Sequence, residues 1–178
     1  MRGSSDTLLA MFDQSERLIE LRDVLLARAP RPTVPVTGLR ELRDRLEGAI
    51  PEWWFDVFLS SPLGGTELLP PETGLDTDVG SLVGKSLVWL DAADVIDELE
   101  CYEDSGLFRH TRTIPLVRTR FRVGSAWVSN PDPLCLRFDE RDADGLVISV
   151  SHECGPSAEG DIQVAKSFVD FLGRCLRA

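Results

Sequence analysis

The densest group of side chains that could do chemistry is His152-Glu153-Cys154. An imidazole can take the proton of a neighbouring thiol, and the resulting thiolate is the nucleophile of cysteine-dependent enzymes. Successive residues of a strand point to opposite faces, so His152 and Cys154 share a face and could approach each other. The strand predicted over 146–152 also continues its apolar row into His152, which favours a structural histidine hydrogen-bonded to backbone at a strand end. We therefore predict no catalytic residue, and a small Cys/His-dependent hydrolase or transferase stays as the alternative.

The sequence gives less support to a phosphate-binding loop or a metal site than to the group at residues 152–154. The stretch 80–86 is one residue short of the phosphate-loop pattern, and it leads into a predicted strand. A phosphate loop needs a helix N-terminus facing the anion, so the pattern fails on its mechanism. The chain has two histidines and no C-x-x-C pair, so the spacing of a structural zinc site is missing. The sequence predicts no metal and no cofactor.

The charge balance limits the classes of partner. The chain has 178 residues, with 19 basic against 30 acidic side chains and a formal net charge of −11. Nucleic acids and anionic membrane surfaces require clustered Lys and Arg, so this balance argues against both. A basic protein partner, attracted by complementary charge, stays possible, and the alternative is a self-repelling surface whose charge serves solubility alone.

The distribution of apolar residues and cysteines bears on location. No apolar stretch approaches the about 18 residues of a membrane span. The apolar run 8–12 ends at Asp13, so it does not have the pattern of a signal peptide. The four cysteines show no paired spacing, and Cys175 lies at helical spacing from Phe168, as a core residue would. We expect a cytoplasmic protein with reduced thiols.

The order of the expected elements predicts an α+β fold, with a mixed, largely antiparallel β-sheet flanked by N-terminal helices and a C-terminal helix. A proline run over 30–35 separates an amphipathic N-terminal helix from the rest, which divides the chain into 1–36 and 37–178. Apolar periodicity and turn residues predict helices over 6–28, 37–50, 51–63, 91–104 and 161–176, and strands over 86–90, 113–118, 120–128, 133–139 and 146–152.

The tryptophans are candidates for partner contact. Trp53 and Trp54 are adjacent on a predicted helix, so one ring can lie outward while the other is buried. Large exposed rings are typical of protein interfaces. The alternative is that the N-terminal helix partly covers both rings. The candidate partner-binding residues are Trp53, Trp127, His152 and Glu153.

The order of several motifs resembles the SUKH superfamily, which groups a fungal regulator of cell-wall synthesis with many bacterial toxin-immunity proteins. The stretch 39–59, with Ile50-Pro51-Glu52 followed by Trp53-Trp54-Phe55 and closed by Gly64-Gly65, is similar to the opening of that family. Later stretches are similar to its strand with capped helix, its central strand, its His-acid pair and its closing helix, and these are 87–98, 114–116, 152–153 and 165–172.

The resemblance implies a protein-binding scaffold with a mixed sheet flanked by helices and no shared catalytic residues. It implies, most concretely, a cytoplasmic immunity protein that binds and neutralises a cognate toxin. An acidic surface would suit a basic toxin domain by mimicking a phosphate backbone. A regulatory scaffold without a toxin partner stays open, and so does a homodimer in which the helix 6–28 packs on a second copy.

Overall fold

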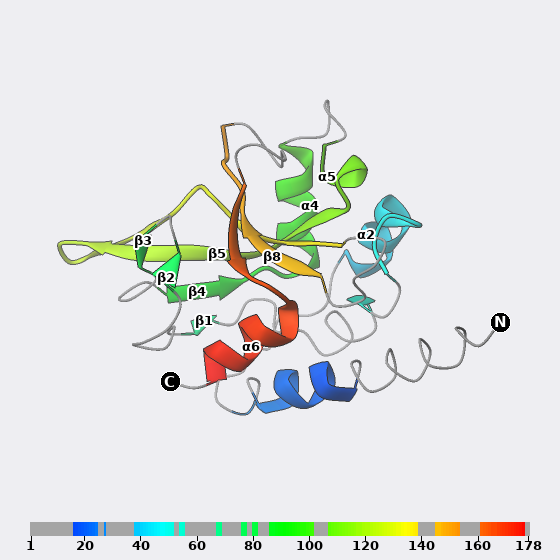
Figure 1. Cartoon of the computed structure of the whole chain (residues 1–178). Helices are drawn as coiled ribbons and strands as arrows, with labels where there is room; N and C mark the ends of the chain where they lie inside the picture. The colour runs from blue at the N-terminus through cyan, green and yellow to red at the C-terminus, as the bar shows by residue number, and fades with distance from the viewer. Residues whose placement is uncertain are drawn as a thin grey trace.

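A sheet of antiparallel strands runs through the molecule (Figure 1). The computed structural model describes residues 16–24, 27, 38–51, 54–55, 67–68, 76–77, 80–81, 86–101, 107–138, 145–153 and 161–176. The strand order is β1-β4-β5-β7-β8-β9, with β6 beside β5, and every described pairing is antiparallel. The strands are β1 (Glu67–Leu68), β4 (Ser86–Trp89), β5 (Thr113–Val123), β6 (Ala126–Ser129), β7 (Leu134–Arg137), β8 (Leu146–Ser149) and β9 (Ile162–Ala165). A separate pair is β2 (Asp76–Thr77) with β3 (Gly80–Ser81).

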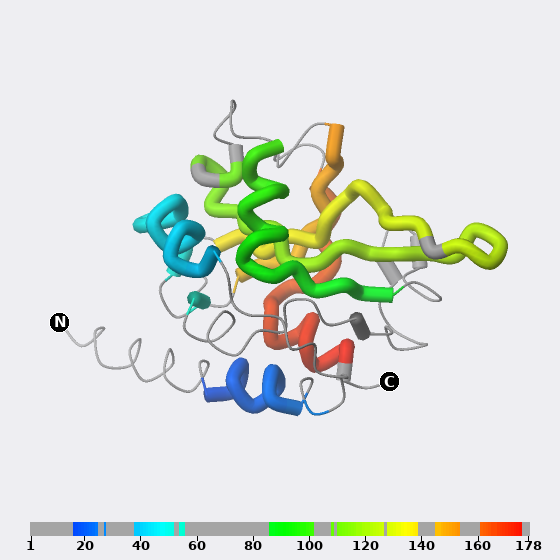
Figure 2. Tube along the Cα trace, turned by 180° about the vertical axis from the view of Figure 1, so that it is seen from behind, coloured from blue at the N-terminus to red at the C-terminus, as the bar shows by residue number. Residues whose placement is uncertain are grey.

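Helices cover both faces of this sheet, which confirms the predicted α+β class (Figures 1 and 2). The named helices are α2 (Leu39–Leu46), α4 (Ala92–Glu100), α5 (Leu107–His110) and α6 (Phe168–Leu176). Val88 pairs with Arg118, whose guanidinium contacts α4. The neighbouring Trp89 points the opposite way, and its ring lies 6.0 Å from that of Phe171 in α6. Within the described ranges, no helix has the length and apolar character needed to cross a membrane.

The N-terminal helix packs against the same core. Residues 16–24 are helical, as predicted for this part of 6–28, and they lie below α6 in both views (Figures 1 and 2). Leu18 and Leu21 belong to the buried cluster that also holds Trp89 and Phe171. Ile19, between these two residues, is 37% exposed. The segment therefore packs on its own chain, whereas the division at residue 37 stays a prediction.

The predicted start of α4 is confirmed. The carboxylate of Asp91 accepts a hydrogen bond from the Asp94 amide, and the Asp94 side chain bonds back to the Asp91 amide. This capping box satisfies two amides that the helix leaves without partners. The helix ends at Glu100 with Cys101 as its C-cap, short of the predicted end at 104.

Helix α2 begins one residue later than predicted, after Gly38 instead of Thr37. Gly38 has a φ of 81°, and a Cβ there would lie 3.1 Å from Cδ1 of Ile96 in α4. A side chain at this position would be strained and crowded, so glycine allows the start of α2 to approach α4. The expected apolar face is present, with Leu42 and Leu46 buried.

The expected break between strands 113–118 and 120–128 was wrong. The structure has one long strand, β5, because Thr119 is buried and pairs with Leu87 without interruption. The chain turns instead at Gly124, whose φ of 63° suits the first position of a two-residue hairpin turn into β6.

The expected helix over 161–176 was also wrong in its first part. Residues 162–165 form β9, which pairs with β8, and α6 starts only at Phe168. The Ser167 hydroxyl accepts a hydrogen bond from the Asp170 amide at 3.0 Å, which marks the true start of the helix. Phe168, Phe171 and Cys175 are buried on this shorter helix.

Candidate partner-binding site

Strands β6 and β7 pair one after the other with the same edge of β5, and the candidate site begins between them. Ser129 pairs with Arg120 and Leu134 pairs with Val117, so residues 130–133 lie opposite only residues 118 and 119. The Asn130 amide still donates to the Thr119 carbonyl at 2.7 Å. Pro131 and Pro133 have no amide hydrogen to donate, so the chain bulges between them and Asp132 leaves the ladder.

Asp132 binds the turn that follows β8. Its Oδ1 accepts a hydrogen bond from the His152 amide at 2.9 Å and lies 2.7 Å from His152 Nδ1. Burial alone would raise the pKa of Asp132, but the hydrogen bonds from the His152 backbone and ring, with the charge of the ring, lower the pKa below its ordinary value. Two distant turns are thereby joined through one carboxylate.

The predicted position of His152 in an apolar strand row was wrong. Strand β8 ends at Ser149, and the Val150 amide donates to the Pro133 carbonyl at 3.1 Å as the last step of the pairing with β7. The chain then turns at residues 152–153, which leaves the His152 side chain 45% exposed. The ring contacts a carboxylate because the bulge at residues 130–133 places Asp132 beside it.

Two of the described thiols, Cys135 and Cys175, are buried. Cys135 is fully buried, and burial raises the pKa of its thiol well above the usual range, with smaller contributions from Glu98 and Asp161. Burial likewise raises the pKa of Cys175 to about 12. Cys154 lies outside the described residues. In the ranges that the structure describes, no group of three or more His, Cys, Asp or Glu side chains is placed to hold a metal ion.

The hairpin of β5 and β6 projects beyond the rest of the sheet (Figures 1 and 2). Its register pairs Phe121 with Val128 and Val123 with Ala126, which places four apolar residues on one face. Val123 is 58% exposed and Val128 is 39% exposed, so this face is open to solvent.

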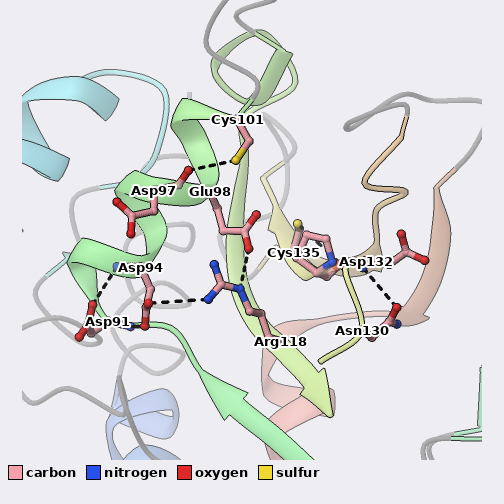
Figure 3. A network of polar contacts seen from close by, with 10 residues as sticks. Asp91, Asp94, Asp97, Glu98, Cys101, Arg118, Asn130, Asp132 and Cys135 are labelled. Carbon is pink, nitrogen blue, oxygen red and sulfur yellow. Dashed lines mark hydrogen bonds and ion pairs between the residues drawn. The ribbon is translucent and has the colours of Figure 1, made fainter. Parts of the chain in front are cut away.

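The opposite face of the hairpin is basic. Residues 118, 120 and 122 are arginines that alternate along β5 and therefore share a face, and Arg122 is exposed. Arg118 is held against α4 by Glu98 at 2.6 Å and by Asp94 at 3.8 Å (Figure 3). Helix α4 thus covers the first of the three arginines.

Three of the four predicted partner-binding residues lie in β6 or in the turn that is joined to the bulge after β6. Trp127 is in β6, where it pairs with Arg122. His152 and Glu153 form the turn after β8, and the contact with Asp132 brings that turn to the bulge that follows β6. Trp53 lies outside the described residues.

The prediction missed the apolar face of the hairpin and the role of Asp132. A signal for the hairpin was present, because Gly124-Ser125 between alternating residues is typical of a two-residue hairpin turn. No local pattern could have indicated the Asp132–His152 contact, since 20 positions separate the two residues.

Comparisons with protein-family models, with curated proteins and with solved structures find no match to this chain.

Proposed function

We propose that this chain is a non-catalytic protein-binding module, and most concretely a cytoplasmic immunity protein that binds and neutralises a toxin. The observation that carries the proposal is the projecting hairpin, where Val123 and Val128 expose apolar surface on a chain of net charge −11. Apolar residues exposed together on one face of a hairpin form a candidate surface for protein association.

Charge and sequence resemblance supply the narrower part of the proposal. The net charge of −11 would attract a basic partner from a distance and raise its association rate. The resemblance to the SUKH superfamily supports toxin neutralisation over a regulatory scaffold without a toxin, which is the nearest alternative.

A hydrolase or transferase is a second candidate because of one contact. The Asp132 carboxylate lies 2.7 Å from Nδ1 of His152, as the acid that orients the base does in a catalytic triad. Cys154, the nucleophile of that alternative, lies two positions further along the chain. Asp132 also accepts the His152 amide, which favours a structural role for the pair.

Growth rescue tests the proposed function. The gene beside that of this chain would be expressed in a bacterium with and without the full-length chain. We expect the neighbouring product to arrest growth, the chain to restore it, and the two proteins to elute together in size-exclusion chromatography. Absence of both rescue and a complex would contradict toxin neutralisation.

One variant separates the binding module from the enzyme. In a binding module, Cys154→Ser keeps growth rescue, because the thiol does not react with the toxin. In an enzyme this variant folds as shown by circular dichroism but loses rescue, since the nucleophile is gone. Cys101→Ser, at an exposed helix end, is the matched control.

A further inference from the structure

We draw no further inference here: the strongest candidate, the apolar face of the β5–β6 hairpin together with the outer edge of β6, belongs to the surface on which the proposed function already rests, and nothing in the described residues shows what covers it.

Discussion

The two halves of β5 differ in what covers them. Residues 113–117 are all buried between the helices that pack on either side of the sheet. Residues 122–123 of the same strand are exposed, and the strand there is paired with β6. The change runs over residues 118–121, where half-buried residues flank the buried Thr119 and α4 holds Arg118 through Glu98.

This difference shows that strand continuity and burial have separate causes. The first half is fixed by packing, because large side chains such as Trp89 and Phe171 fill the space beneath it. The second half is fixed by a hairpin turn and a backbone ladder, which do not need burial. Substitutions in the second half, which carries the proposed binding face, should therefore leave the packing of the core unchanged.

The largest difference in the free energy of unfolding is expected between a side-chain truncation in the core and one in the hairpin. Phe171→Ala should lower the free energy of unfolding by about 3–5 kcal/mol, because it leaves a cavity among buried rings. Val123→Ala should change it by about 0.5 kcal/mol or less. Urea denaturation followed by circular dichroism measures both, and similar losses would mean that the hairpin is part of the core.

The next effect tests whether the N-terminal helix belongs to the packed region. Leu18 is 1% exposed, so Leu18→Ala should lower the free energy of unfolding by about 2–4 kcal/mol. Ile19→Ala, at the exposed neighbour, should cost about 0.5 kcal/mol or less. If both variants lower the free energy of unfolding equally, the helix contributes nothing to the core. Residues 37–178 then fold alone, as the predicted division implies.

A smaller effect concerns the junction between the two regions. The pKa of Asp132 is lowered in the folded state, so its contribution is present above the ordinary carboxyl value of about 4 and is lost as the pH falls through the lower folded value. Asp132→Asn should therefore destabilise the protein by about 1 kcal/mol at neutral pH, with the difference closing under acid.

Denaturation midpoints at neutral pH and below about pH 4 measure this closing. The control is Asp97→Asn, which changes an exposed carboxylate of α4. A difference between wild type and Asp132→Asn that stays constant with pH would show that the contact acts through shape and not through charge.

The smallest effect on stability is expected from modifying an exposed thiol. Iodoacetamide should label Cys101 in the native protein without changing its unfolding midpoint. Cys135 and Cys175 should react only after unfolding, because burial keeps both as thiols, the latter with a pKa of about 12. Peptide mass spectrometry before and after urea treatment distinguishes them, and native labelling of Cys135 would contradict its burial.

Local chemistry made part of the fold predictable from sequence. The start of the helix at residue 91 and the apolar periodicity of the helix over 37–50 each depend on nearby residues. The cap at Asp91 and the burial of Leu42 and Leu46 confirm them. The stretch 162–165 was assigned to a helix because Ile, Val and Ala fit either period in so short a run. Only pairing with β8, far away in sequence, makes it a strand.

The candidate site was less predictable because long-range contacts build it. His152 was assigned to a strand row on parity alone, and parity has no meaning after β8 ends at Ser149. Its partner Asp132 lies in a bulge that exists because β6 and β7 share one edge of β5. Such an arrangement follows from sheet topology, which a single sequence does not reveal.

The bulge at residues 130–133 also bears on how this protein can diverge. It separates β6 from β7, so an exchange at an exposed β6 position such as Val128 falls outside the packed sheet. Proteins lie close to a stability threshold, and surface exchanges of this kind usually cost little stability. A lineage could therefore alter β6 to follow the proposed partner at little cost in folding.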